Sequence, residues 1–281
     1  MKSPQAPFPF FGGKSKIAPL VWQALGQPKH YIEPFFGSGA VLLARPDWGP
    51  QTHVESVCDK DGFLANVWRG LQFAPDEVAK WCDWPVNHAD LSARKKKLIE
   101  SEGYLLEHLI NDDMWFDAKL AGYWIWAASC WIGGGLTRIG QIPHITHGRG
   151  VHKIGQIPAK GEQHDDVQAP YKISIYTWFR ELSERLRYVR VVCGDWTRVC
   201  GGDWQDDNGL CGIFFDPPYG SEKRDKRIYH SDSLTIAQDV AKWSAERGKK
   251  NTYRIVLCGY YEEHQWLLQE GWRVLRWQAG G

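Results

Sequence analysis

The chain has 281 residues, of which 43% are hydrophobic and 24% are charged, and its formal net charge at pH 7 is +1. A chain of this length forms one α/β domain with a large insertion or two modest domains, and either would bury a substantial core. The net charge is too small to indicate a nucleic-acid partner by itself, so such a partner has to be inferred from where the cations lie.

The sequence also argues against membrane and disulfide-rich proteins. No stretch approaches the roughly 18 apolar residues that a membrane span needs, and no apolar segment follows residues 1–5. The seven cysteines are scattered and include no Cys-x-x-Cys pair, so we expect reduced structural thiols and no metal site. We therefore expect a cytoplasmic protein without membrane contact.

Residues 7–16 contain a Gly-Gly turn followed by basic residues, and the apolar spacing of residues 17–25 predicts a helix. Glycines let the backbone approach a ligand closely, and the ammonium group of Lys14 suits a carboxylate there. We therefore count Phe11, Gly12 and Lys14 as candidate cofactor-binding residues. An ordinary turn is the alternative, because a Gly-Gly-Lys loop is weak evidence alone.

A second glycine turn lies between a short strand predicted from His30 and an apolar helix predicted from Ala40. This order of elements is typical of nucleotide-type cofactor sites. The turn lacks the third glycine of the dinucleotide fingerprint. Glu33 also places a carboxylate at a position where a phosphate-binding loop would not carry one. It therefore favours a cationic or amino-bearing cofactor over NAD. The candidate cofactor-binding residues are Glu33, Pro34, Phe35, Gly37, Ser38 and Gly39.

A second strand is predicted at residues 54–59, and it ends in an acid. Ribose-binding carboxylates in such folds stand at the end of the second strand, so we predict that Asp59 binds ribose hydroxyls. The alternative is that Asp59 caps a helix or stands in a turn before Gly62. Asp61 is the local competitor for the ribose.

Between residues 75 and 187 the alternation of strands and helices stops, and helical patches at 91–110 and 178–186 surround an irregular centre. We therefore expect an inserted, mainly helical domain at 75–187, between two parts of an α/β domain at 1–74 and 188–281.

Part of this insertion is strongly basic. Residues 118–161 contain no Asp or Glu, and the motif Ile-Gly-Gln-Ile-Pro occurs at 139–143 and again at 154–158. Two similar arms around a Gly-rich tip suggest a basic hairpin or loop, whose Arg, Lys and Gln side chains suit contacts to DNA backbone and base edges. A solvated loop is the alternative. The candidate DNA-binding residues are Arg138, Gln141, Arg149, Lys153 and Gln156.

Strands return after residue 187. Apolar runs predict strands at 188–193, 212–215 and 253–258. The carboxyl ends of such strands line the ligand cleft of an open α/β sheet. Asp195 and Trp196 follow the first of these strands and join the cofactor-binding candidates.

The strand at 212–215 leads directly into an Asp-Pro-Pro-Tyr segment. Two prolines fix φ and donate no hydrogen bonds, so the segment forms a rigid, extended ledge with a free carbonyl oxygen. Asp216 and the Pro217 carbonyl would accept the two N–H hydrogens of an exocyclic amine, while Tyr219 stacks on the ring. An ordinary Asp-Pro turn is the alternative. The candidate catalytic residues are Asp216, Pro217, Pro218 and Tyr219. Basic residues that follow, suited to a polyanion backbone or to a solvated face, are Lys223, Arg224, Lys226 and Arg227.

In this order, the motifs resemble those of the Dam-type (class alpha) adenine-N6 DNA methyltransferases, in which cofactor motifs precede an inserted target-recognition domain and the catalytic motif follows it. Residues 10–14 look like the family's N-terminal cofactor motif, residues 33–39 like its glycine loop and residues 59–66 like its ribose-binding segment. Residues 216–219 are similar to its catalytic tetrad.

The resemblance covers roughly residues 8–72 and 188–277. It does not extend to the insertion, where the repeated arms look more like phage or prophage relatives than GATC-specific members. The recognition sequence therefore stays open.

The resemblance implies a Rossmann-like, S-adenosylmethionine-dependent methyltransferase sheet with an inserted, mainly helical target-recognition domain. S-Adenosyl-L-methionine would be the methyl donor, S-adenosyl-L-homocysteine the product, and no metal would be needed. The substrate would be an adenine flipped out of double-stranded DNA, whose amine attacks the sulfonium methyl group while Asp216 and the Pro217 carbonyl hold it. We expect a monomer or weak dimer in a bacterial cytoplasm.

Three alternatives stay open. An RNA adenine would suit the same ledge, because the ledge reads a base and not a sugar. A cytosine-N4 enzyme is disfavoured because such enzymes usually carry Ser where this chain has Asp216. A non-catalytic nucleic-acid-binding relative is disfavoured because Asp216, Tyr219, Asp59 and Gly37 are all intact.

Overall fold

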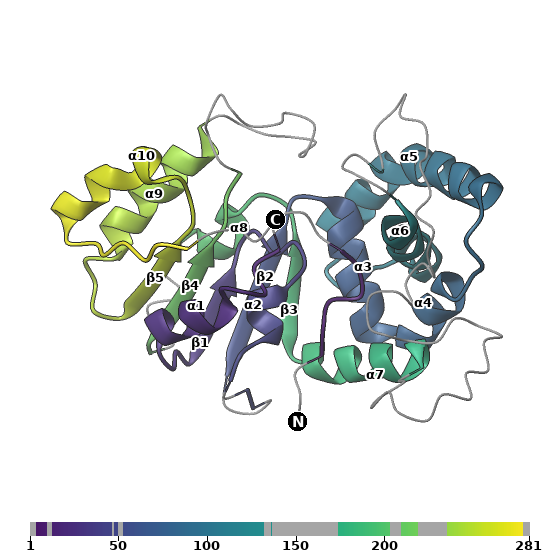
Figure 1. Ribbon diagram of the computed structural model, residues 1–281, viewed down its shortest axis with the longest axis horizontal. Helices are drawn as coiled ribbons and strands as arrows, with labels where there is room; N and C mark the ends of the chain where they lie inside the picture. Colours follow the sequence, from purple (N-terminus) through teal and green to yellow (C-terminus); the bar gives the residue numbers. More distant parts are fainter. Residues whose placement is uncertain are drawn as a thin grey trace.

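The computed structural model describes residues 4–9, 13–46, 48–49, 53–131, 136, 174–202, 209–218 and 235–277. They form a five-stranded, all-parallel sheet with helices on both faces and a further group of helices beyond one edge (Figure 1). The fold is therefore α/β and is compatible with a Rossmann-like arrangement.

The sheet has the strand order β3-β2-β1-β4-β5. β1 pairs with β2 on one side and with β4 on the other, so the direction in which the chain adds strands reverses at β1. Every residue of β1 and β4 is buried, because helices cover both faces of the sheet. The strands are β1 (His30–Glu33), β2 (Val54–Asp59), β3 (Val189–Cys193), β4 (Cys211–Phe215) and β5 (Tyr253–Leu257).

Two apolar clusters cover the two faces of the sheet. Side chains alternate along each strand, so Tyr31 and Val57 belong to one cluster and their neighbours Ile32 and Cys58 to the other. The helices of the first cluster nearest the sheet are α1 (Ala18–Leu25), α2 (Ala40–Leu43) and α3 (Gly62–Phe73). The elements on the opposite side are α8 (Thr197–Cys200) and α9 (Ile236–Arg247), with α10 (Tyr261–His264) and the 3-10 helix η3 (Gln265–Glu270) near the C-terminus.

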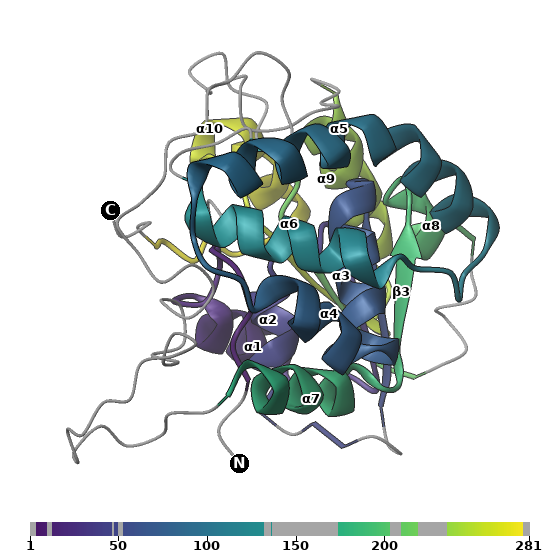
Figure 2. The ribbon, with the colours of Figure 1, turned by 90° about the vertical axis from the view of Figure 1, so that its right-hand side faces the viewer.

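The helices beyond the β3 edge pack around α3 (Figure 2). α3 is buried from Gly62 to Leu71. The apolar side chains of these helices belong to the cluster that also covers the first face of the sheet, so sheet and helices share one core. The helices are α4 (Pro75–Cys82), α5 (His88–Asn111), α6 (Ala118–Cys130) and α7 (Ile175–Leu186).

Four of the helices begin at residues whose side-chain oxygen accepts a hydrogen bond from the first turn. Asp61 caps α3, Asn87 caps α5, Asp117 caps α6 and Ser174 caps α7. Such caps satisfy main-chain N–H groups that have no partner inside the helix. Asp61, the competitor for the ribose, therefore has a structural role.

Arg69 ties α3 to the edge of the sheet and to the end of α5. Its side chain is buried and donates to the carbonyl oxygens of Val191 at 3.0 Å, Leu109 at 3.2 Å, Asp112 at 2.7 Å and Trp115 at 3.2 Å. Four main-chain partners satisfy a buried guanidinium without a carboxylate.

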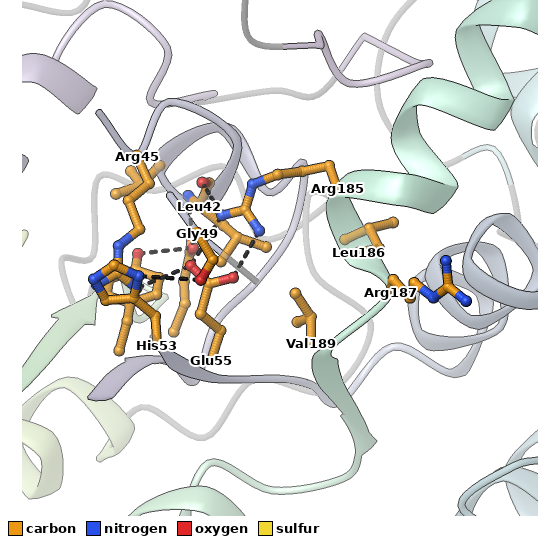
Figure 3. Close-up of polar contacts among 12 residues, drawn as sticks. Leu42, Arg45, Gly49, His53, Glu55, Arg185, Leu186, Arg187 and Val189 are labelled. Carbon is orange, nitrogen blue, oxygen red and sulfur yellow. Dashed lines mark hydrogen bonds and ion pairs between the residues drawn. The ribbon is translucent and has the colours of Figure 1, made fainter. Parts of the chain in front are cut away.

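A buried ionic network joins α7 to the beginning of β2 (Figure 3). The Glu55 carboxylate accepts a hydrogen bond from Nη1 of Arg45 at 2.9 Å. It also accepts hydrogen bonds from Nη1 and Nη2 of Arg185, at 2.6 and 2.9 Å. Arg185 also donates to the Leu42 carbonyl at 2.8 Å, and Arg45 donates to the Pro28 carbonyl at 2.5 Å. The carboxylate therefore has two cationic partners, one of them bidentate.

The structure confirms the predicted elements. The strand predicted at 54–59 is β2, and the strands predicted at 188–193, 212–215 and 253–258 differ from β3, β4 and β5 by one residue at one end. The helices predicted at 17–25, 91–110 and 178–186 correspond to α1, α5 and α7. The division into domains at 1–74, 75–187 and 188–281 stays a prediction, and the apolar side chains of α4 to α7 belong to the same cluster as the first face of the sheet.

All seven cysteines are buried free thiols, as predicted. None of the helices that the structure describes has the length and apolar character needed to cross a membrane. Within the described ranges, no three His, Cys, Asp or Glu side chains are grouped so that they could hold a metal ion.

Candidate cofactor and substrate site

The carboxyl ends of β1 and β4 lie side by side where the strand order reverses. In open α/β sheets, ligands bind in the crevice outside the strand ends at such a point. The turn at 33–39 ends β1, Asp59 ends β2 and Asp216 follows β4. The fold therefore brings the predicted cofactor and catalytic segments together at the carboxyl ends of the strands, which point upward in Figure 1.

The turn after β1 has a backbone that requires glycine. Gly37 has a φ of 49° and Gly39 a φ of 63°, a left-handed conformation that glycine adopts without strain. A Cβ atom on Gly39 would lie 2.8 Å from Cζ of Phe36 and 3.3 Å from Cζ2 of Trp68. The Trp68 indole also donates to the Gly37 carbonyl at 2.9 Å, so α3 holds the turn in place.

Asp59 lies at the end of β2 beside this turn. Its Oδ2 accepts the Gly37 N–H at 2.8 Å, and its Oδ1 accepts the Asp61 N–H at 2.9 Å. Burial and then the nearby charge of Asp61 raise the pKa of Asp59 to about 7, although main-chain hydrogen bonds act in the opposite direction. Asp59 is thus a half-buried acceptor in a fixed position, and the ribose contact stays a prediction.

Glu33 is 2% exposed at the end of β1. Its Oε2 accepts the Tyr31 hydroxyl at 2.9 Å and the Leu42 N–H at 3.2 Å. Burial raises the pKa of Glu33 to about 8, although both hydrogen bonds act in the opposite direction. The observed contacts therefore hold one Glu33 oxygen against α2 rather than toward solvent, and a contact with the cofactor stays a prediction.

Lys14 and Asp216 form an ion pair, with Nζ of Lys14 2.5 Å from Oδ2 of Asp216. The side chain of Asp216 is 19% exposed and that of Lys14 only 8%. The Lys14 ammonium also lies 5.6 Å from the ring centroid of Trp277. The ion pair fixes the orientation of the Asp216 carboxylate, so the structure places Lys14 at the catalytic candidate.

The two prolines that follow Asp216 continue from a well-anchored strand end. Pro217 is buried and Pro218 is half-buried. The Cys258 N–H donates to the Phe215 carbonyl at 2.8 Å, so the end of β5 holds the end of β4 immediately before the ledge.

Asp195 and Trp196, which follow β3, both have structural partners. Oδ1 of Asp195 accepts the N–H of Thr197 at 3.0 Å and its hydroxyl at 2.7 Å. The ring of Trp196 is buried and lies with its centroid 6.0 Å from that of Phe215 and 6.1 Å from that of Trp243. The Asp195 contacts lie at the start of α8, and the Trp196 ring helps to cover the second face of the sheet. A cofactor contact by either residue stays a prediction.

The remaining candidates of the glycine turn contribute less specific contacts. Pro34 is buried, Ser38 is half-buried, and the half-buried Phe35 ring lies 6.3 Å from that of Phe215. The predicted residues that lie outside the described ranges are Phe11, Gly12, Tyr219, Arg138, Gln141, Arg149, Lys153, Gln156, Lys223, Arg224, Lys226 and Arg227.

Sequence reasoning missed Trp68 and Trp277, which contact the turn and Lys14 respectively. The chain has 16 tryptophans, and in such a background no single one is distinctive. The sequence signal that was available for Trp68 is its place in the apolar helix that follows Asp59.

A scan against protein-family models finds no match to this chain, and no curated protein is significantly similar to it. A function therefore has to be argued from the residues and their geometry.

Proposed function

We propose that this protein is an S-adenosylmethionine-dependent methyltransferase of the Dam type that methylates the N6 amine of adenine in double-stranded DNA. The observation that supports this most is the position of Asp216. It starts an Asp-Pro-Pro segment at the carboxyl end of β4, is paired with Lys14, and follows the strand next to β1, whose turn is hydrogen-bonded to Asp59.

The hydrogen-bond acceptors at the carboxyl ends of the strands fit the proposed cofactor. S-Adenosylmethionine carries ribose hydroxyls, an amino group and a positive sulfonium, and carboxylates are suitable partners for all three. Asp59 would bind the ribose, and the glycines of the 33–39 turn would allow close backbone approach. When bound, the cofactor supplies a methyl group whose C–S bond breaks as a C–N bond to the amine forms, and the amine then loses a proton.

Asp216 and Pro217 would position the acceptor amine. The Asp216 carboxylate accepts one N–H of the amine and the Pro217 carbonyl accepts the other, which leaves the nitrogen lone pair directed outward. Lys14 acts as a positioning residue through the ion pair with Asp216. Holding two reactants in line can contribute about 7–11 kcal/mol to catalysis. An amine that attacks a sulfonium becomes acidic only after the C–N bond has formed, so a strong general base is not needed.

The helical part at 75–187 would be the target-recognition domain, with the basic segment at 118–161 in contact with DNA. An adenine in a duplex is stacked and paired, so it has to be flipped out, at a cost of a few kcal/mol.

The variant Asp216→Ala tests this proposal. Methyl transfer to duplex DNA should be abolished while cofactor affinity in titration calorimetry stays within a few fold, because Asp216 is assigned to the amine. Asp239→Ala removes an exposed acid from α9 and serves as the matched control.

Three results would contradict part or all of the proposal. If Asp216→Ala loses cofactor affinity in proportion to activity, Asp216 has the wrong role. If the wild-type protein methylates structured RNA and not duplex DNA, the substrate is RNA adenine. If the wild-type protein transfers a methyl group to neither DNA nor RNA, the proposed function is wrong.

A further inference from the structure

A cavity of about 660 Å³ lies between α4, α5 and α6, away from the candidate site. Figure 2 looks onto these three helices. The cavity is lined by aromatic rings and by cations, among them Trp84, Tyr104, Tyr123, Arg94, Lys97 and Lys119. A volume of this size is within the range of small-molecule sites, roughly 300–1,000 Å³.

Two of the aromatic rings are well exposed and yet fixed in position. Trp84 is 46% exposed, and its indole donates to Oδ2 of Asp90 at 2.7 Å. Tyr104 is 49% exposed, and its ring lies 4.3 Å from His108 and 5.5 Å from Trp115 by ring centroids. Exposed rings held in this way are suitable platforms on which a planar base stacks.

Within the described residues, no carboxylate oxygen forms an ion pair with the cations of the cavity. The Arg94 guanidinium is buried against the rings of Tyr123 at 4.3 Å and Trp126 at 4.4 Å, and it donates to the Trp81 carbonyl at 2.9 Å. Lys119 lies 4.6 Å from the ring of Trp81. Among the residues that the structure describes, no ion pair involves Arg94, Lys97 or Lys119.

The acids that also line the cavity are already engaged. Asp90 accepts hydrogen bonds from Trp84 and Asn87, Asp117 caps α6, and Glu100 lies 3.9 Å from Lys96. The acids keep their charge, but their printed contacts turn toward Trp84, Asn87, Lys96 and the first turn of α6, whereas the exposed ammonium groups of Lys97 and Lys119 stand beside the aromatic rings. This arrangement suits a ligand that combines an aromatic ring with a negative charge.

We propose that this cavity binds a nucleotide, with the base against Trp84 and Tyr104 and the phosphate at Lys97 and Lys119. Two sources share this chemistry: a nucleotide within a DNA strand, or a free nucleotide. α5 lies at the same end of the molecule as the carboxyl ends of the β-strands in both ribbon views. A DNA strand bound at the candidate site would reach the cavity by extending along this end of the molecule. The DNA source rests on the proposed function.

The test compares alanine variants of Tyr104, Lys97 and Lys119 with the wild-type protein. The probes are a fluorescein-labelled duplex with a single-stranded overhang, read by anisotropy, and dAMP, read by calorimetry. Tyr104→Ala should weaken binding about tenfold, which corresponds to about 1.4 kcal/mol. Each lysine variant should also lower the slope of log affinity against log salt on the overhang by about 0.7.

Two matched controls lie outside the cavity. Lys242→Ala removes an exposed cation from α9, and Tyr188→Ala removes a 56% exposed tyrosine that immediately precedes β3. Both should bind the probes as the wild type does. The lysine positions are exposed, so their variants are expected to fold, and circular dichroism checks this for all variants.

The outcomes separate the ligand sources and the two proposals. Weaker binding of the labelled DNA, with or without weaker binding of dAMP, assigns the site to a nucleotide within a DNA strand, and weaker binding of dAMP alone assigns it to a free nucleotide. Equal binding by the wild-type and cavity variants overturns the cavity proposal. If the wild type still methylates DNA in that case, the proposed function stands, whereas absence of methyl transfer alone contradicts only the proposed function.

Discussion

The two ends of β2 each carry an acid on the same face of the strand. One acid is bound by two guanidinium groups, and the other only by main-chain N–H groups. Glu55, near the amino end, accepts three hydrogen bonds from Arg45 and Arg185 (Figure 3). Asp59, at the carboxyl end, is held by the main-chain N–H groups of Gly37 and Asp61, and no ion pair of Asp59 occurs among the described residues.

This difference separates a structural acid from a ligand-binding candidate. Glu55 is 3% exposed, so a ligand cannot reach it without breaking the network. Asp59 is half-buried, and its pKa is raised to about 7 because its burial is not offset by a cation. Asp59 also stands at the carboxyl end of a parallel strand, where ligands of open α/β sheets bind, and a shifted pKa at such a position is typical of functional groups.

The largest effect is expected from Glu55→Gln. The substitution leaves Arg45 and Arg185 buried without a negative partner and should lower the free energy of unfolding by about 3–5 kcal/mol. Urea denaturation followed by circular dichroism measures this.

The matched control for Glu55→Gln is Asp76→Asn. Asp76 also accepts two hydrogen bonds from one guanidinium, those of Nε and Nη2 of Arg180, both at 2.8 Å. Both side chains of this pair are more than half exposed. Solvent screens exposed pairs, so its urea midpoint should not change measurably. Equal midpoints for the two variants would contradict a structural role for the Glu55 network.

The next effect concerns pH. The pKa of Glu33 is raised to about 8 by burial, so the folded state binds a proton more tightly than the unfolded state does. The stability from protonated Glu33 is present below the unfolded pKa, near 4.3, and is lost as pH rises through about 8.

Glu33→Gln should therefore flatten the dependence of stability on pH between about 5 and 8, by at most about 1.4 kcal/mol per pH unit. Thermal unfolding in a series of buffers measures this slope, and Glu262→Gln, an exposed acid of α10, is the control. A slope as steep as that of the wild type would place the titrating group elsewhere, with Asp59 the first candidate.

The smallest effect is expected from Asp59→Ala. It should appear in cofactor binding, together with some loss of stability because the Gly37 and Asp61 N–H groups lose their acceptor. Loss of hydrogen bonds to ribose should weaken affinity for S-adenosylmethionine by about 1–3 kcal/mol in calorimetry. Asp61→Ala, which removes the α3 cap, should instead lower stability and leave cofactor affinity unchanged. The reverse result would exchange the roles of the two acids.

The sequence was sufficient for every strand and for the position of Asp59 and Asp216 at strand ends, because apolar runs and prolines act locally. It was not sufficient for contacts between distant segments. Arg185 binds Glu55 across 130 positions, and its helix has the pattern of an ordinary amphipathic helix. The same limitation applies to Lys14 and Asp216, whose ion pair exists only because α1 lies beside β4 and β5.

Trp196 illustrates a second limitation. Its place after a strand end predicts a cofactor contact, which stays a prediction, but the sequence did not show that its ring packs against Phe215 and Trp243. Burial of a tryptophan is decided by partners that lie far apart in the chain.

The four carbonyl contacts of Arg69 have a consequence for how the protein melts. They join α3, the sheet edge and the end of α5, and the apolar core is continuous across the same boundary. The helices and the sheet should therefore form one cooperative unit, and scanning calorimetry should record a single heat-absorption peak. An insertion that folded independently would instead produce two peaks, and Arg69→Ala would then leave the peak of the sheet unchanged.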